Sequence, residues 1–199
     1  RGLVLSFFGK SSHASQPENG HNPARAISKL IIDIPELTAR EDHRGIVMAT
    51  VVCVRIGEEA FGTNAGFGQL MLTIRAEFES ELDALDAEIC ARARAYARQD
   101  GITNVEVQYR DSFPETRNTP DAVAAVRKAR LECGLPEALW DEPFRSSEDF
   151  GCYTKLTSGA LFYIGCGTRH AKLHTREYDF NDEIIEPAVD MMFRLAQDA

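Results

Sequence analysis

The segment Gln69–Phe78, QLMLTIRAEF, alternates between two kinds of side chain along most of its length. Positions 70, 72 and 74 carry Leu, Leu and Ile, whereas positions 69, 71, 73 and 75 carry Gln, Met, Thr and Arg. Because successive side chains of a strand point to opposite faces of a sheet, this alternation predicts a strand with one buried face. The β-branched run Ile46–Ile56, which ends before Gly57, predicts a second strand that pairs with the first.

One helix is predicted before this strand pair in the sequence and one after it. Asn22 and Pro23 form a good N-cap and N1 pair, and apolar residues then recur at helical spacing up to Ile34, where Pro35 interrupts the run. A second helix is predicted from residue 80, where Ser and Asp resemble a capping box, to the Asp-Gly pair at 100–101.

Two further strands complete the first domain, at residues 3–8 and 105–109. The resulting order is β-α-β-β-α-β over about 110 residues, the split arrangement in which an antiparallel sheet carries both helices on one face. The sequence therefore predicts an α/β fold of the α+β type, with a ferredoxin-like domain over residues 1–111.

Residues 112–199 are predicted to form a second unit with few elements. A helix capped by Thr119 leads to Gly134, a short strand is expected at Ala160–Ile164, and a last helix is expected near 182–196. These elements are too few to cover both faces of a sheet, so this unit is expected to be part of an α/β domain. Apolar helix faces are then expected to lie uncovered within this chain, at Val123, Val126, Ile185, Val189 and Phe193.

Composition excludes several classes of protein. The chain has 199 residues, with 31 acidic and 22 basic side chains, a formal charge of −9 and a pI near 5.1, so nucleic acid is not an expected partner. No run approaches the roughly eighteen apolar residues of a membrane span. The five cysteines are scattered and odd in number, which favours reduced thiols in the cytoplasm. The first residue is Arg1, followed at once by a strand, so the chain is expected to begin inside a larger fold.

Candidate chemistry lies in two loops. The loop Gly165–Asp179 contains His170 and His174 near two carboxylates, Glu177 and Asp179, and imidazole with carboxylate is a common ligand set for zinc or manganese. A surface histidine with an ordinary polar role is the alternative. His13 follows the first strand in a segment too polar to be core, which makes it a second candidate.

Three other residues have both a functional and a structural interpretation. The guanidinium of Arg75 suits a ligand carboxylate, although an arginine within a strand also forms ion pairs. Asn64, between Gly62 and Gly66, fits a turn as well as a binding site. Glu148 fits either a site or the start of a helix.

Five motifs in the same order resemble the aminoacylase and carboxypeptidase G family of dinuclear zinc metallopeptidases, amidohydrolase branch, which includes hippurate hydrolases. The first is Gly9–Pro17, GKSSHASQP, with Gly20 and Asn22-Pro23 after it. The others are Asn64, the segment Leu72–Arg75, the segment Ser146–Phe150 (SSEDF) and the segment Leu173–Phe180 (LHTREYDF). The resemblance covers nearly the whole chain.

The resemblance implies that residues 1–111 are the lid, or dimerisation domain, and that residues 112–199 are the C-terminal segment of the catalytic domain. A larger N-terminal catalytic segment, which would carry most metal ligands and the general base, is not in the sequence. His174 would be the last metal ligand, and His13 would polarise the scissile carbonyl from the partner subunit. Asn64 and Arg75 would bind substrate, and Glu148 would line the cleft. The Pro that often follows the family's Asn is missing after Asn64.

The implied reaction is amide hydrolysis of N-acyl amino acids or small peptides by a homodimer that forms through the lid. The complete enzyme would use two divalent metal ions, zinc with manganese or cobalt as alternatives, and this chain alone would hold none or an incomplete set. A non-catalytic dimerisation or ligand-binding module is the alternative function. A regulatory ferredoxin-like domain would fit residues 1–110 and leave the His174 loop without a role.

Overall fold

The computed structural model describes residues 1–138, 140, 142–168 and 170–197. The chain divides into two compact units, Arg1–Glu115 and Thr116–Ala199, close to the expected division after residue 111. The interpretation of these units as a lid and a catalytic segment stays a prediction. In the described part of the chain, no helix combines the length and apolar character that crossing a membrane requires.

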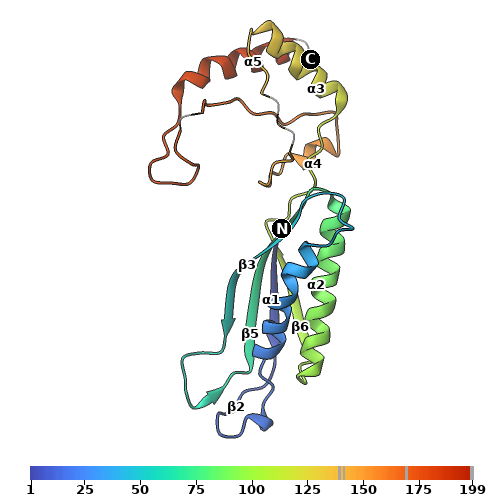
Figure 1. Ribbon diagram of the computed structural model, residues 1–199, viewed down its shortest axis with the longest axis vertical. Coiled ribbons are helices and arrows are strands. Elements are labelled where there is room, and N and C mark those ends of the chain that lie inside the picture. Colours follow the sequence, from blue (N-terminus) through green and yellow to red (C-terminus); the bar gives the residue numbers. More distant parts are fainter. Residues whose placement is uncertain (139, 141, 169, 198–199) are drawn as a thin grey trace. The chain divides into compact units, whose positions relative to one another are not determined.

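The first unit is a four-stranded antiparallel sheet with two helices (Figure 1). Its strands are β1 (Gly2–Phe8), β3 (Val47–Ile56), β5 (Phe67–Ala76) and β6 (Asn104–Arg110), in the spatial order β3-β5-β1-β6. This order is that of the split β-α-β-β-α-β arrangement and confirms the expected fold class. Strand β5 extends from residue 67 to residue 76, two residues earlier at each end than the alternation suggests.

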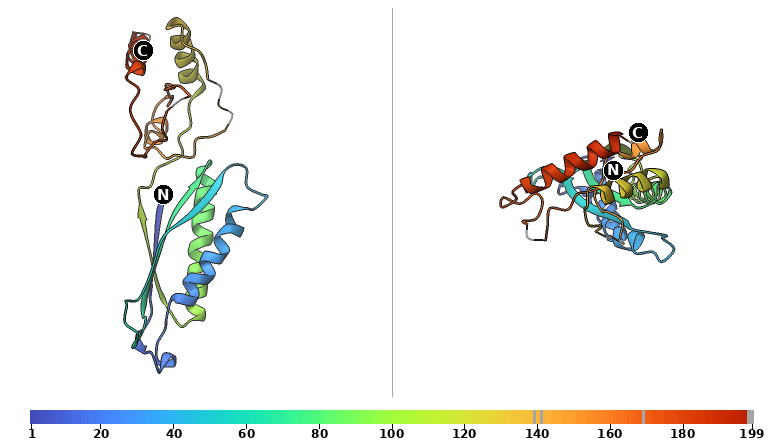
Figure 2. Two further views of the ribbon diagram at one scale, coloured as in Figure 1. Left: turned by 60° about the vertical axis from the view of Figure 1, so that its left-hand side comes forward. Right: turned by 90° about the horizontal axis from the view of Figure 1, so that it is seen from above.

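Both helices of the first unit, α1 (Ala24–Thr38) and α2 (Glu79–Gln99), cover the same face of the sheet (Figure 2). The core lies between these two layers because alternate strand residues and one stripe of each helix are apolar. Its fully buried large side chains include Leu3, Leu5, Phe7, Ile27, Leu30, Leu70, Leu72, Ile74 and Ile89. The sequence pattern therefore places the odd-numbered positions of β5 on the opposite, open face.

A β-bulge in β3 returns Val54 and Ile56 to the face that the helices cover. Val51 lies opposite Leu72 and Cys53 lies opposite Met71, so Val52 is the extra residue. Without this extra residue, the strand's alternation would place Val54 on the open face, whereas Val54 pairs with core residue Leu70. Val52 itself is 62% exposed, at an edge of the sheet.

Pro35 does not end the first helix, contrary to the expectation from the sequence. Helix α1 continues for three more residues, to Thr38, although Pro35 removes one backbone donor. The continuation buries Leu37 in the core, and the Thr38 hydroxyl donates to the Ile34 carbonyl oxygen at 3.2 Å. We attribute the continuation to this burial, which offsets the lost hydrogen bond.

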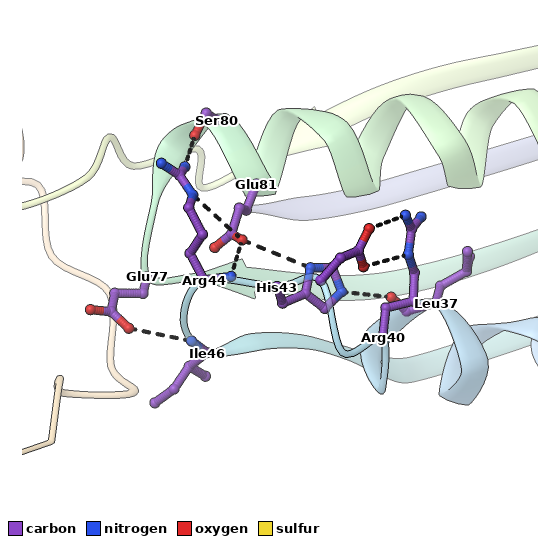
Figure 3. A network of polar contacts seen from close by, with 9 residues as sticks. Leu37, Arg40, His43, Arg44, Ile46, Glu77, Ser80 and Glu81 are labelled. Carbon is purple, nitrogen blue, oxygen red and sulfur yellow. Dashed lines mark hydrogen bonds and ion pairs between the residues drawn. The ribbon is translucent and has the colours of Figure 1, made fainter.

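The expected capping box at Ser80 and Asp83 is also wrong. Helix α2 begins at Glu79, and its first backbone N–H donates to the Glu115 carboxylate at 3.0 Å. The Ser80 hydroxyl instead accepts a hydrogen bond from Arg44, and the Glu81 carboxylate accepts one from the Arg44 backbone N–H (Figure 3). The start of α2 therefore holds the loop between α1 and β3.

The second unit consists of helices joined by long loops. Its helices are α3 (Pro120–Glu132), α4 (Gly151–Thr154) and α5 (Ile185–Gln197), with a 3₁₀ turn, η2 (Asp182–Ile184), before α5. Helices α3 and α5 pack against each other. The two long helices thus lie where the sequence predicts them.

The expected strand at Ala160–Ile164 is not formed, and the described residues of this unit contain no strand. The backbone of Leu161 is hydrogen-bonded to a side chain instead of to a strand. The Asn118 side chain accepts from the Leu161 N–H and donates to the Leu161 carbonyl oxygen, each at 2.9 Å. An isolated segment without a neighbouring strand has no ladder to join.

The expected uncovered apolar surface of the second unit is confirmed on α5. Ile185, Val189 and Phe193 are each about half exposed or more, whereas Met191 on the same helix is buried. Val123 and Val126 on α3 are partly buried. Exposing an apolar surface of several hundred Å² to water is unfavourable by several kcal/mol, at about 25 cal/mol per Å².

Candidate functional site

His13 lies in a small two-stranded structure at one end of the first unit, labelled β2 in Figure 1. Strand β2 (Ser12–His13) pairs antiparallel with β4 (Thr63–Asn64), so that His13 is opposite Thr63. Two glycines allow neighbouring backbone segments to approach closely here. A Cβ atom on Gly9 would lie 1.9 Å from the His21 carbonyl oxygen, and one on Gly66 would lie 2.2 Å from the Ser11 nitrogen. We call this structure, residues 9–22 with 62–66, the tip.

Asn64 anchors the tip through its carboxamide. Its Nδ2 donates to the Ser12 hydroxyl at 3.0 Å and to the Pro17 carbonyl oxygen at 3.5 Å. Its Oδ1 accepts from Nδ2 of Asn22 at 2.7 Å, and Oδ1 of Asn22 accepts from the Ala24 N–H at the start of α1. The tip is therefore tied to the helical layer, and Asn64 keeps one acceptor lone pair for another partner.

The imidazole of His13 is exposed but held at one nitrogen. The backbone N–H of Ser15 donates to Nδ1 of His13 at 3.2 Å, and the Ser15 hydroxyl oxygen lies 2.7 Å from the same atom. Because a backbone N–H can only donate, this contact favours an unprotonated Nδ1 in the neutral ring. The proton is then on Nε2, which makes His13 a hydrogen-bond donor toward solvent.

Arg75 lies on the open face of the sheet, near the other end of β5. It is opposite Met48 of β3 in the strand register. On the same face, Gln69 donates to the Ser6 hydroxyl at 3.0 Å, which satisfies the only polar side chain that is buried on β1. Of the predicted site residues in the first unit, the structure thus brings Asn64 and His13 together and places Arg75 apart from them.

Both predicted site residues of the second unit are exposed. Glu148 precedes α4 in a loop. His174 has a φ of +66°, a left-handed backbone conformation that is uncommon outside glycine. Such conformations gather at functional sites, where the surrounding structure maintains them. This backbone geometry distinguishes His174 from His170, whose Nδ1 lies 2.9 Å from the neighbouring Ala171 carbonyl oxygen.

The described residues do not form a metal site. Across residues 1–138, 140, 142–168 and 170–197, no group of three or more His, Cys, Asp or Glu side chains is arranged to hold an ion. Glu177 and Asp179 follow His174 closely in the sequence but do not join it in such a group. A metal centre built from this loop alone is therefore not supported.

Sequence reasoning missed the residues that support His13. Ser15 contacts the His13 ring and Ser12 contacts Asn64, and the sequence patterns assign no individual role to either serine. Asn22 was expected only as the N-cap of the first helix, and it also contacts Asn64. Their signal is weak because serine and asparagine are common in any polar turn. A serine two residues after a candidate histidine, in a turn, is the only pattern that could have suggested Ser15.

Comparison with known proteins places these features in a family. The sequence profile described as Peptidase family M20/M25/M40 matches residues 12–198. The chain is 27% identical over 198 residues to N-acetyldiaminopimelate deacetylase of Bacillus licheniformis, a match that covers 96% of this chain and 50% of the relative. It is 22% identical to hippurate hydrolase of Campylobacter jejuni, with the same two coverages.

Solved structures show the same fold. The YXEP protein of Bacillus subtilis, described as a dinuclear metal-binding peptidase of the M20 family, matches 98% of this chain and 48% of its own length. Its TM-score is 0.72 at 16% sequence identity. The chain thus spans about half the length of the relatives it matches.

Proposed function

The chain belongs to peptidase family M20/M25/M40, and from that premise we propose that it is part of a metal-dependent amidohydrolase. Its substrates would be N-acyl amino acids or small peptides, in keeping with relatives named for a deacetylase and a hippurate hydrolase. The observation that carries the proposal is the exposure and hydrogen bonding of the His13 imidazole. An exposed imidazole with its proton on Nε2 can donate a hydrogen bond to the carbonyl oxygen of a scissile amide.

The remaining predicted residues would bind and orient the substrate. Arg75 would hold the free carboxylate of an N-acyl amino acid through paired, charge-assisted hydrogen bonds. Asn64 would accept a hydrogen bond from substrate with the lone pair that Asn22 leaves unused. Glu148 would line the cleft. Such positioning aligns the amide for attack without changing the chemistry of the step.

The metal ions of this proposal would be zinc, with manganese or cobalt as alternatives. When bound, two such ions supply an activated water and an electrophile for the carbonyl oxygen. The described residues offer no complete ligand set, so His174 would contribute one ligand and the others would come from the half of the relatives' length that this chain does not span. The roles proposed for this chain are therefore those of its own side chains, which bind the substrate and polarise its carbonyl.

We propose that the protein is a homodimer that pairs through the β3 edge of the lid. Both β3 and β6 are edge strands, and an uncovered edge invites another strand. Strand β6 carries Glu106, Gln108 and Arg110 along its length, which discourages pairing. Strand β3 is longer and exposes Val51, Val52 and Val54. In this dimer, His13 would act on substrate bound by the partner.

A cytoplasmic location completes the proposal. All five cysteines are free thiols, and Cys152 is exposed. Free, exposed thiols are typical of a reducing compartment. The proposal names no nucleic acid or membrane partner, since the chain carries a formal charge of −9.

The test is an activity assay of the full-length protein on N-acetyl and N-benzoyl amino acids and dipeptides. We expect hydrolysis that a chelator abolishes and that added Zn²⁺, Mn²⁺ or Co²⁺ restores. His174→Ala should lower the bound metal, whereas the matched variant His170→Ala should not. The proposal fails if metal-loaded protein hydrolyses none of these amides, or if the chelator leaves the rate unchanged.

A further inference from the structure

We infer that Ser15 is a positioning residue for His13. The Ser15 hydroxyl holds the His13 imidazole in the neutral tautomer whose proton is on Nε2, the only neutral form that can donate from that atom. The inference rests on the proposed function of His13 and adds a residue to it. It starts from two contacts to a single ring atom, Nδ1 of His13, made by the backbone N–H and the side-chain hydroxyl of Ser15.

The direction of the hydroxyl contact follows from the backbone contact. A hydroxyl can donate or accept, so the 2.7 Å distance alone leaves its role open. The Ser15 N–H is a fixed donor to Nδ1 and favours the neutral ring in which Nδ1 carries no proton. The Ser15 hydroxyl must then also donate, and both contacts favour the tautomer with the proton on Nε2.

The backbone around the ring is fixed independently of these contacts. His13 and Gln16 close a turn, in which the Gln16 N–H donates to the His13 carbonyl oxygen at 2.9 Å. The Ala14 N–H donates to the Gly62 carbonyl oxygen, also at 2.9 Å, and Asn64 ties β2 to the start of α1. Removing the Ser15 hydroxyl should therefore free the ring without displacing the strand that carries it.

This arrangement matters because His13 is exposed. A solvent-exposed imidazole without side-chain partners samples both tautomers and several rotamers, and only some of these direct Nε2–H at a substrate. The Ser15 hydroxyl reduces that freedom before substrate arrives. Its contribution should appear in the rate of the chemical step, since the donated hydrogen bond strengthens as charge develops on the carbonyl oxygen.

The test compares three serine variants. Ser15→Ala removes the hydroxyl, Ser15→Thr keeps a hydroxyl at the same atom, and Ser11→Ala is the matched control, because the Ser11 hydroxyl lies toward Gly66. Long-range ¹H–¹⁵N spectra of this chain, at about pH 8.5 where an ordinary imidazole is neutral, report which ring nitrogen is protonated. His13→Ala identifies the His13 signals.

We expect separate protonated and unprotonated nitrogen signals for His13 in the wild type, in Ser15→Thr and in Ser11→Ala. In Ser15→Ala the backbone N–H of residue 15 still donates to Nδ1, so both signals should move only part of the way toward the average. In the full-length protein, Ser15→Ala should lower kcat about fivefold with KM unchanged, the effect of one ordinary hydrogen bond. If Ser15→Ala shows wild-type spectra and a wild-type kcat, the inference is wrong. If His13→Ala loses activity in the same experiments, the proposed function of His13 still stands. Full activity in His13→Ala would overturn both.

Discussion

His13 and Arg75 lie at opposite ends of the first unit. Strand β5 runs from Phe67, which pairs with Phe8 next to the tip, to Arg75, which pairs with Met48. Eight residues of strand separate these points, about 25 Å at the usual rise. The carboxylate and the scissile carbonyl of an N-acyl amino acid are only a few bonds apart. One chain therefore cannot apply both side chains to one such substrate, so in the proposed dimer a site would combine Arg75 of one chain with His13 of its partner.

Mixed dimers test this division of labour. We expect His13→Ala and Arg75→Ala homodimers of the full-length protein each to be impaired. In a mixed dimer, one site would combine Arg75 of the first chain with His13 of the second, and the other site would lack both. Random mixing should then recover about a quarter of the wild-type rate, because half of the dimers hold one intact site. Recovery no greater than the sum of the two homodimers would contradict shared sites.

Arg75→Lys tests the assigned carboxylate contact. Lysine keeps the charge but loses the planar pair of donors, so KM for substrates with a free carboxylate should rise about tenfold, about 1.4 kcal/mol. Steady-state kinetics on an N-acyl amino acid and on its primary amide provide the comparison. The amide substrate serves as the control, because it should respond to the substitution weakly. An equal rise of KM for both substrates would argue against a carboxylate site at Arg75.

Val52→Lys tests the proposed dimer edge. Val52 is the bulge residue of β3 and is 62% exposed, so a lysine there leaves the core intact and places a charge on the edge. Light scattering should show a dimer for the wild type and a monomer for Val52→Lys. Gln108→Lys places the same charge on the other edge strand, β6, and should remain a dimer. A dimer for Val52→Lys together with a monomer for Gln108→Lys would place the interface at β6 instead.

Much of the first unit could be predicted from the sequence because its apolar residues repeat with the period of each element. The details that failed depend on distant residues. The run Val51-Val52-Cys53 looks like an unbroken strand, and only the partner β5 reveals that Val52 is an extra residue. Likewise, Glu115 occupies the start of α2 from far along the chain, which no local capping pattern can show.

The second unit and the site show a different limit. The segment Ala160–Ile164 has the composition of a strand, but a strand also needs a neighbour, and Asn118 occupies the backbone of Leu161 instead. The sequence indicates a polar segment around His13, but the pairing of β2 with β4 that brings His13 near Asn64 depends on a distant part of the chain. The contact of Ser15 with the ring was not foreseeable either, because it depends on the turn that brings Ser15 back toward His13.

Cys90 should be inert toward thiol reagents in the folded protein. Burial, together with its hydrogen bond to Asp86, raises the pKa of the Cys90 thiol to about 12, and only the thiolate reacts. Brief alkylation at about pH 8, the usual range for thiol reagents, followed by peptide mass analysis should find Cys152 modified and Cys90 unmodified. In urea, both should react. Rapid labelling of native Cys90 would show that α2 opens readily.

Asp33 should stabilise the packing of α1 on α2 in a pH-dependent way. Its carboxylate accepts hydrogen bonds from Arg92, at 2.8 Å, and from the Tyr96 hydroxyl. Burial alone would raise the pKa of Asp33, but these hydrogen bonds outweigh burial and hold the pKa below its usual value. A carboxyl group with a lowered pKa in the folded state contributes stability above its unfolded pKa, near 3.9, and loses that contribution as the pH falls through the folded value.

Asp33→Asn should therefore lower the free energy of unfolding by about 0.5–1 kcal/mol at neutral pH, a modest value because Arg92 is about one-third exposed. The difference from the wild type should shrink below about pH 4. Urea unfolding followed by circular dichroism between pH 3 and pH 7 measures it. Asp42→Asn is the matched control, because Asp42 pairs with Arg40 in one exposed loop and bridges no two elements. A difference that is the same at every pH, or equal in the two variants, would show that the charge of Asp33 does not join the helices.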